Sequence, residues 1–214
     1  MTSAPKLAPL ARRDTRSPLR RISRSELPVD TTRLAQYLIG KMIVHDLPQG
    51  RVSGRIVETE AYVVGDSACH AYVGMTPRNR TLFLERGHAY VYVAYGLHFL
   101  LNVSGERAGI GAGVLLRAME PMEGIEIMEV YRGTKNILAL ARGPGRLAEA
   151  LGVDRRQDGM DLCAPGELWL GQGVRSDVAI GTSVRIGITK DAHRLLRFYE
   201  RGSSFVSGPR QLSP

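Results

Sequence analysis

The 214 residues are enough for one domain with a buried core, and a composition of 43% hydrophobic and 23% charged residues excludes collagen, coiled coil and disorder throughout. The formal net charge of +8 favours an anionic partner such as nucleic acid or a membrane surface. The two cysteines, Cys69 and Cys163, lie far apart without a C-x-x-C spacing, so we expect a reducing compartment and neither a disulfide framework nor a structural zinc site.

Residues 1–27 predict a disordered basic arm. Residues 1–30 contain seven basic and three acidic residues, with scattered proline, arginine and serine and no apolar periodicity to offset the entropy of ordering. They also lack the apolar core of a secretory signal. We expect folding to start near residue 28, and the arm either binds an anionic partner or has no function.

The first elements of the folded part are a helix and a hairpin. Asp30 predicts a helix cap, followed by an apolar face and a stop at Gly40. Residues 41–46 and 52–62 have the character of two strands around a Pro-containing turn, which together predict a hairpin. Residues 63–88 contain Gly65, Gly74, Pro77 and Gly87 and have little periodicity, so we expect a long loop with a helical turn near residues 82–83.

The rest of the chain predicts a mixed fold. Strands are expected at residues 89–103, 114–118, 167–170, 183–188 and 196–199. Helices are expected from Glu120-Pro121, with Met122, Ile125 and Met128 on one face, and at residues 145–151. Because strands adjoin turns more often than helices, the sequence favours a mainly antiparallel sheet over a doubly wound parallel one.

Two carboxylates in the expected strand 52–62 attract attention. Glu58, Glu60 and Tyr62 share one face of a strand because side chains alternate with period two. That face is either solvent-exposed or holds a general base beside an aromatic platform.

Aromatic and basic clusters offer further candidates. Tyr90, Tyr92 and Tyr95 lie in A-Y-V-Y-V-A-Y-G, which is either a core or edge strand or a surface on which nucleobases stack. Residues 76–80 (T-P-R-N-R) form either a phosphate-binding loop or a solvated turn.

Several common site types lack sequence support. The chain has no P-loop, no G-x-G-x-x-G and no G-x-S-x-G motif. Cys69 and His70 are adjacent, and neighbouring side chains of an extended segment point in opposite directions, so we expect no metal site there.

Read together, these segments resemble the alkyladenine (3-methyladenine, N-methylpurine) DNA glycosylase family of base-excision repair enzymes. The matching motifs, in order, are G-R-I-V-E-T-E-A-Y (54–62), residues 66–70, T-P-R-N-R (76–80), Y-V-Y-V-A-Y-G (90–96), L-N-V-S (101–104), V-L-L-R-A-M-E-P (114–121), A-R-G-P-G-R-L (141–147), D-V-A-I-G (177–181) and L-R-F-Y-E-R-G-S (196–203).

The resemblance implies a catalytic site. Glu60 would activate water and Arg117 would help to hold that water. Tyr62, His70 and Tyr92 would sandwich a base that is flipped out of the duplex. Glu58 belongs to the same motif, but no chemistry is assigned to it.

The resemblance also implies contacts with DNA. Tyr95 would be the wedge that intercalates into the base stack, and Asn102 would reject bases with a 2-amino group. Arg78, Arg80 and Arg142 are candidates for contacts with the DNA backbone.

The implied architecture is a single compact α+β domain around a curved antiparallel β-sheet, with surrounding helices and a protruding β-hairpin. This domain would span residues 28–208 and be followed by a tail at residues 209–214. We expect a monomer without cofactor, metal, membrane contact or obligate protein partner. Its substrate would be double-stranded DNA with damaged purines, in the bacterial cytoplasm at the nucleoid, or in the nucleus of a eukaryote.

The expected reaction is hydrolysis without strand cleavage. Glycosylases that also nick the strand attack with an amine, and none of the four lysines falls in the matched Glu60, tyrosine or Arg117 segments. Two alternatives remain: a catalytically silent protein that binds lesions, and a metal-dependent nuclease that uses Glu58, Glu60 and His70.

Overall fold

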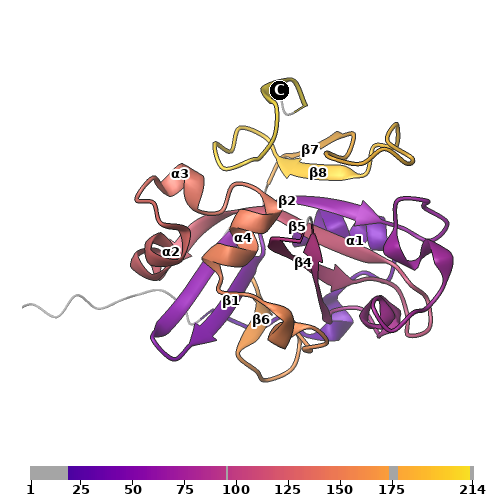
Figure 1. Ribbon diagram of the computed structural model, residues 1–214, viewed down its shortest axis with the longest axis horizontal. Helices are drawn as coiled ribbons and strands as arrows, with labels where there is room; N and C mark the ends of the chain where they lie inside the picture. Colours follow the sequence, from indigo (N-terminus) through magenta and orange to yellow (C-terminus); the bar gives the residue numbers. More distant parts are fainter. Residues whose placement is uncertain (1–18, 95, 174–177, 213–214) are drawn as a thin grey trace, which may run out of the picture.

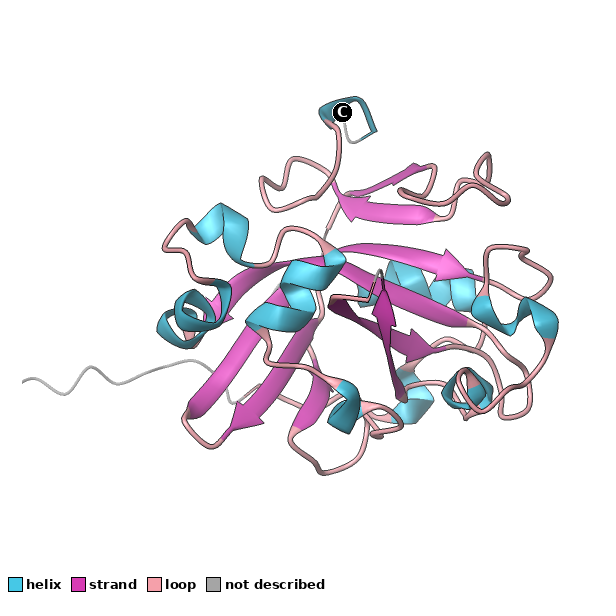
Figure 2. Cartoon of the chain, viewed as in Figure 1, coloured by secondary structure: helices cyan, strands magenta, loops and turns pink. Residues whose placement is uncertain are grey.

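The computed structural model describes residues 19–94, 96–173 and 178–212, which form a mixed α+β fold around one antiparallel sheet, as predicted (Figure 1, Figure 2). The strand order is β3-β4-β5-β2-β1-β6; β8 also pairs with β2, and β7 pairs with β8. The strands are β1 (Met42–Leu47), β2 (Gly50–Tyr62), β3 (Ala89–Ala94), β4 (His98–Ser104), β5 (Gly113–Glu123), β6 (Leu168–Gly171), β7 (Ile180–Ser183) and β8 (Arg197–Glu200).

Short helices connect and cover the strands. The α-helices are α1 (Thr31–Leu38), α2 (Ile125–Arg132), α3 (Ile137–Leu140) and α4 (Pro144–Ala150). The 3-10 helices are η1 (Arg24–Glu26), η2 (His70–Val73), η3 (Arg80–Phe83), η4 (Arg155–Gln157) and η5 (Arg210–Leu212). Helix α1 packs on β2 and β5, whereas α4 packs on β4 and β5 and crosses the front of the sheet in Figure 1.

Helix α1 and the first hairpin agree with the sequence prediction. The Asp30 carboxylate accepts a hydrogen bond from the Arg33 N–H at 2.8 Å, which caps the helix, and Leu34 and Leu38 are fully buried. β1 and β2 pair from Met42 opposite Arg55 to Leu47 opposite Gly50.

Strand β2 is the central strand of the fold. It pairs with β5 along most of its length, with β1 through its first half and with β8 through Glu58 to Glu60. Residues 52–61 are all buried. Both faces of β2 are therefore covered, and the alternative of a solvent-exposed face at Glu58 and Glu60 is wrong.

The single strand predicted at residues 89–103 is instead two strands. β3 and β4 form a hairpin, and Gly96 in its turn has φ of +71°, a backbone conformation that favours glycine. Gly96, Leu97 and His98 are exposed at the end of this hairpin.

Two further boundaries differ from the prediction. Glu120 and Pro121 belong to β5, and the helix begins only at Ile125, because Gly124 turns the chain with φ of +72° and a Cβ there would lie 2.3 Å from the Arg51 carbonyl oxygen. The strand predicted at 183–188 is also wrong: β7 ends at Ser183, and the next residues direct their polar groups to buried carboxylates. The predicted helix at 145–151 is confirmed as α4.

The boundary of the N-terminal arm needs correction. Residues 1–18 lie outside the described part, but residues 19–27 are packed on the domain. Ile22 is fully buried and its N–H donates to the Leu170 carbonyl oxygen at 2.9 Å, while Leu27 is 2% exposed. The local sequence does not predict this packing, because residues 19–27 bind residues about 150 positions further along the chain.

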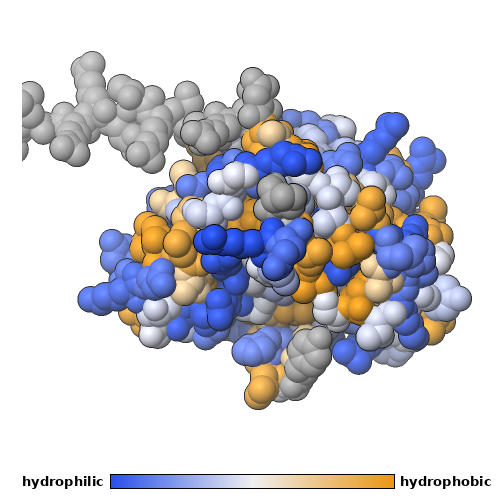
Figure 3. All heavy atoms as spheres, turned by 90° about the horizontal axis from the view of Figure 1, so that it is seen from above, coloured by the Kyte–Doolittle hydropathy of each residue, from blue (hydrophilic) through white to orange (hydrophobic). Residues whose placement is uncertain are grey.

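The described surface is mixed in character. In the view from above, hydrophilic and hydrophobic residues are interspersed (Figure 3). Among the described residues, no helix combines the length and apolar character required to cross a membrane.

The packing of residues 19–27 predicts a loss of stability on truncation of Ile22. Ile22→Ala should lower the free energy of unfolding by about 2–5 kcal/mol, because it removes a fully buried side chain and leaves a cavity. Val130→Ala, which truncates a side chain that is 79% exposed on α2, is the control and should change it by less than about 0.5 kcal/mol. Urea unfolding measures both values, and equal effects would show that the segment does not contribute to the core.

Candidate functional site

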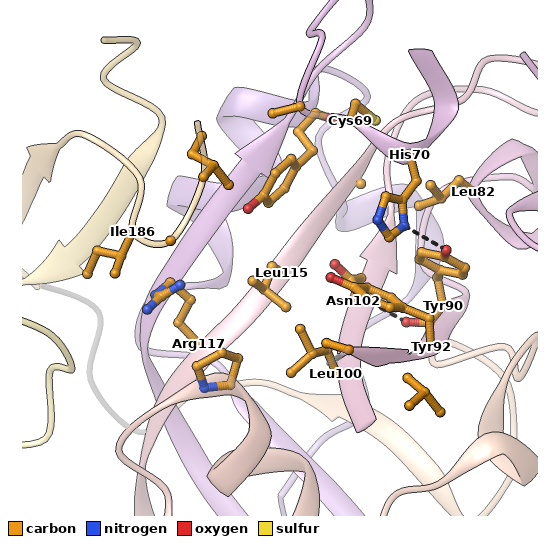
Figure 4. A pocket seen from close by; sticks show the side chains of 18 of the residues that line it. Cys69, His70, Leu82, Tyr90, Tyr92, Leu100, Asn102, Leu115, Arg117 and Ile186 are labelled. Carbon is orange, nitrogen blue, oxygen red and sulfur yellow. Dashed lines mark hydrogen bonds between the residues drawn. The ribbon is translucent and has the colours of Figure 1, made fainter. Parts of the chain in front are cut away.

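A cavity of about 490 Å³ opens between the β3–β4 hairpin, the ends of β2 and β5, and segments near residues 68–70 and 186–188 (Figure 4). His70, Tyr90, Tyr92 and Asn102 form one side of it, and Arg117 and Ile186 lie opposite. The lining residues are Tyr62, Ala68, Cys69, His70, Arg78, Leu82, Tyr90, Tyr92, Val93, Ala94, Leu100, Asn102, Gly113, Leu115, Arg117, Pro144, Ile186, Gly187 and Ile188.

Glu60 lies behind the wall of this cavity. Its side chain has no exposed surface, and three of its neighbours, Tyr62, Arg117 and Ile186, line the cavity. Oε1 accepts the Ile186 N–H at 2.7 Å and lies 3.1 Å from Nη1 of Arg117, and Oε2 accepts the Tyr62 hydroxyl at 2.9 Å. A carboxylate offers about four acceptor positions, and these three contacts use three of them.

Two irregularities in the sheet bring Arg117 to Glu60. Ile56 is opposite Met119 but Glu58 is opposite Ala118, so β2 contains one extra residue there; Thr59 is opposite Leu116, so β5 contains an extra residue at Arg117. Such bulges redirect side chains and are frequent next to functional sites. Here the second bulge aims the Arg117 guanidinium at the carboxylate face of β2.

Glu58 belongs to the same buried cluster. Its Oε1 accepts Nε of Arg117 at 3.0 Å and Nε of Arg197 at 2.6 Å, and its Oε2 accepts the Ser207 N–H at 2.7 Å. Glu58 and Arg197 have no exposed side-chain surface, and Arg117 retains 8%. We call Glu58, Glu60, Arg117 and Arg197 the charge cluster.

Burial controls the ionisation of Glu60. It raises the pKa of this carboxyl, while Arg117, the Ile186 N–H and the Tyr62 hydroxyl act in the opposite direction without cancelling the effect. Burial alone would lower the pKa of Arg117, but attraction to Glu60 and Glu58 raises it, so the guanidinium stays charged.

Tyr62 is held on both sides. Its hydroxyl donates to Glu60, and burial together with the neighbouring Glu60 charge raises the pKa of this phenol, which keeps the donor proton in place. The Arg185 guanidinium lies 4.7 Å from the centre of the Tyr62 ring. Arg185 is itself fixed by Asp66 and by the Ala61 carbonyl oxygen at 3.0 Å.

His70, Tyr90 and Tyr92 form an aromatic wall. The rings of Tyr90 and Tyr92 stack with centroids 5.4 Å apart, and His70 meets Tyr92 edge-on at 4.6 Å. His70 Nδ1 and the Tyr90 hydroxyl share a hydrogen bond of 2.9 Å. Because His70 and Tyr92 touch each other, the structure shows one wall with no space between these two rings.

The protonation state of His70 follows from its neighbours. The surrounding rings withdraw the imidazole from water and Arg78 adds a positive charge nearby; both lower the pKa of His70 below its ordinary value of about 6.5. The ring is therefore neutral at pH 7.

Two buried asparagines hold the backbone around the cavity through hydrogen bonds to carbonyl oxygens. Asn102 on β4 is 6% exposed, lines the cavity and donates to the Tyr90 carbonyl oxygen at 3.2 Å. The buried Asn79 donates to the carbonyl oxygens of His70 and Gly74 at 2.8 and 2.9 Å, which closes the loop that carries His70.

Of the three arginines predicted to contact the DNA backbone, only Arg78 lines the cavity. Arg78 lines the cavity and is exposed, and Arg80 is exposed two residues further on. Arg142 lies elsewhere, with Nε donating to the Val206 carbonyl oxygen at 2.8 Å. Tyr95 lies outside the described residues. Within the described ranges, no three His, Cys, Asp or Glu side chains converge as metal ligands.

Sequence reasoning missed Arg185 and Arg197. Arg185 lies just after β7 and Arg197 on β8, and both are buried. Their acidic partners, Asp66 and Glu58, lie more than 100 positions away in the sequence. Arg197 carried a usable signal, because a charged residue within the short apolar strand L-R-F-Y requires a buried partner.

Comparison with known proteins identifies the class to which this fold and cavity belong. Residues 25–204 match the family model described as methylpurine-DNA glycosylase (MPG). The chain therefore belongs to the methylpurine-DNA glycosylase family, as its motifs predicted.

The relatives cover almost the whole chain. One from Mesorhizobium japonicum is 68% identical over 191 residues, which are 89% of this chain and 92% of the relative. Relatives from Paraburkholderia phytofirmans (52% identical; 91% of this chain and 92% of the relative) and Methanocella arvoryzae (47% identical; 83% and 90%) are also similar. All three are named "Putative 3-methyladenine DNA glycosylase".

The raised pKa of Glu60 predicts a pH-dependent stability difference. Ionisation of a carboxyl whose folded pKa exceeds its unfolded pKa costs stability, and that cost builds up as the pH rises from the unfolded pKa to the folded pKa. Glu60→Gln removes the cost, so its free energy of unfolding relative to wild type should be higher at pH 8 than at pH 5.

Urea unfolding at both pH values measures this difference. Glu123→Gln, which removes an exposed carboxylate from the end of β5, controls for the loss of one charge. An advantage of Glu60→Gln that shrinks between pH 5 and pH 8 would contradict the assignment of a raised pKa.

Proposed function

We propose that this chain is a monofunctional DNA glycosylase that flips alkylated or deaminated purines out of duplex DNA and hydrolyses their N-glycosidic bond. The substrate class comprises 3-methyladenine, 7-methylguanine, hypoxanthine and ethenoadenine. The observation that carries the proposal is the buried Glu60 carboxylate directly behind an aromatic-walled cavity. Its volume of about 490 Å³ lies within the usual range for small-molecule sites. Family membership and the names of the relatives support the same reaction.

The proposed chemistry uses one water molecule. As the C1′–N9 bond breaks, its electron pair moves to the purine and positive charge develops on the sugar. The water oxygen bonds to C1′ and its proton passes to Glu60, which leaves an abasic sugar with a hydroxyl at C1′. A cationic N-alkylpurine departs as a neutral molecule, whereas a neutral purine departs as an anion that takes up a proton from solvent.

The neighbours of Glu60 suit this role. In the proposed reaction the water donates to Oε2, and the Ile186 N–H, the Tyr62 hydroxyl and Arg117 fix the orientation of the carboxylate. The water is held from the cavity side by Arg117, which lines the cavity. The ionised carboxylate also stabilises the cationic sugar electrostatically.

The aromatic wall supplies recognition of the base. In the proposed complex, Tyr92 and His70 cover one face of the flipped purine and Tyr62 covers the other. A neutral His70 adds no repulsion to a cationic purine, and a cation over aromatic faces gains about 0.5–2 kcal/mol. Damaged bases that carry a positive charge are therefore favoured over normal bases.

DNA binding and flipping complete the proposal. A base inside the duplex is unreachable, and extrusion costs a few kcal/mol, least for damaged pairs. In the proposed complex, Tyr95 fills the vacated position, and Arg78 of the cavity lining and the exposed Arg80 pair with phosphates. Arg142 would bind the backbone only if its hydrogen bond to Val206 reorganises.

Glu60→Gln tests the assignment of the general base. The isosteric amide cannot take a proton, so single-turnover excision of hypoxanthine should fall by about 10²- to 10⁴-fold while lesion-duplex affinity changes less than threefold. Alkaline cleavage of the abasic product on a gel measures excision, and no strand break should occur without alkali.

A matched control and two opposing outcomes complete this test. Glu123→Gln should excise at the wild-type rate. Full activity of Glu60→Gln would show that Glu60 is not the general base. Loss of wild-type activity in EDTA would favour metal-dependent chemistry.

Asn102→Ser tests the orientation of the base in the cavity. Guanine differs from hypoxanthine by a 2-amino group, and shortening the buried Asn102 side chain makes room for that group. The ratio of 7-methylguanine to hypoxanthine excision should rise about tenfold. A uniform fall in both rates with reduced thermal stability would show that Asn102 has a structural role only.

A further inference from the structure

Glu58 has no task in the proposed chemistry, yet it is buried as completely as Glu60. It is absent from the cavity lining and all of its donors come from the protein: Arg117, Arg197 and the Ser207 N–H. Burying a carboxylate costs several kcal/mol unless its partners compensate, so its position requires an explanation.

The charges of the cluster balance. Glu58 and Glu60 contribute two negative charges, Arg117 and Arg197 contribute two positive charges, and the sum is zero. Arg117 is shared, because its Nε binds Glu58 at 3.0 Å while its Nη1 lies 3.1 Å from Glu60. Without Glu58, two buried guanidiniums would face one carboxylate, and the wall next to the cavity would carry a net positive charge.

We propose that Glu58 is a positioning and specificity residue that neutralises Arg197 and divides Arg117 between two carboxylates, so that the cavity wall accepts cationic purines. The inference rests on the proposed function. The physical basis of the inference is that a positively charged wall repels a cationic substrate. A neutral purine nucleoside has no net charge, and the charges of the sugar cation and purine anion formed from it sum to zero, so its excision rate responds much less.

The competing explanation is that Glu58 only ties strands together. Arg197 also binds the Ser183 hydroxyl and the carbonyl oxygens of Ser207 and Leu212, so the cluster does hold the C-terminal segment to β2. A second buried ion-pair group on β2 provides a matched control. Arg55 of β2 binds Glu120 of β5 and Glu200 of β8, and none of these three residues lines the cavity.

The experiment compares single-turnover excision of cationic 7-methylguanine with that of neutral hypoxanthine in otherwise identical duplexes. A unit charge acting across about 10 Å at an effective dielectric constant of about 20 changes a rate on the order of tenfold. Glu58→Gln should lower the ratio of cationic to neutral excision about tenfold. Arg197→Gln leaves a net negative cluster and should raise the same ratio. Glu120→Gln should leave it unchanged.

A second readout is the acid limb of the pH–rate profile for hypoxanthine. The groups that face Glu60 are Arg117 from β5, Tyr62 and Glu58 from β2, and the Ile186 N–H and Arg185 from the segment after β7. Glu58→Gln removes a negative charge near Glu60, and Glu60 is then the only carboxylate of the charge cluster that pairs with Arg117. The change favours the ionised form of Glu60, so the acid limb should move to lower pH. Arg197→Gln should move it to higher pH.

The outcomes separate the two claims. Opposite shifts in the two variants support the inference, because a loss of strand pairing would change both in the same direction. Equal ratios in wild type and both variants would overturn it while leaving the glycosylase proposal intact. If Glu58→Gln does not fold, Arg197→Gln alone decides: an unchanged or lower ratio overturns the inference. Absence of excision of both substrates by wild type would instead refute the proposed function.

Discussion

The burial of a carboxylate pair on the central strand is the constraint on which the rest of this structure depends. Glu58 and Glu60 have no exposed side-chain surface, and a buried charge is tolerated only where donors surround it. Besides Tyr62 on β2 itself, the donors come from four places far apart in sequence: β5, β8, residue 186 and residue 207. The need to satisfy these two side chains explains why the C-terminal segments close over β2.

The same arrangement connects stability with reactivity. A carboxyl with a raised pKa is a stronger base than an ordinary one, but its ionised form weakens the fold. Arg117 and the Ile186 N–H limit that loss while keeping the carboxylate oriented. The aromatic wall on the other side of the cavity holds its shape through contacts among His70, Tyr90 and Tyr92.

Local patterns predicted much of the fold. The Asp30 cap, the β1–β2 hairpin and α4 each depend on residues close in sequence, and each is confirmed. The errors at 89–103 and 120–121 arose where a single glycine turns the chain, at Gly96 and Gly124, within segments whose other residues suit a continuous element.

The site was predictable to a lesser degree. Strand alternation placed Glu58, Glu60 and Tyr62 on one face, and family motifs added Arg117, His70, Tyr92 and Asn102. Five of these residues line the cavity, and the two glutamates lie behind its lining and contact Arg117. The acidic partners of Arg197 and Arg185 lie more than 100 residues away, so no local pattern identifies them. The packing of residues 19–27 escaped prediction for the same reason.

The central claim is that the buried Glu60 carboxyl is the base that limits excision at low pH. Carboxyl ¹³C NMR of the glutamate-labelled protein, with Glu60→Gln to assign the resonance, measures its pKa directly. We predict titration above the ordinary glutamate value of about 4.3, at the pH where wild-type excision loses half of its rate. A pKa below that value, or one clearly separated from the acid limb, would contradict the account.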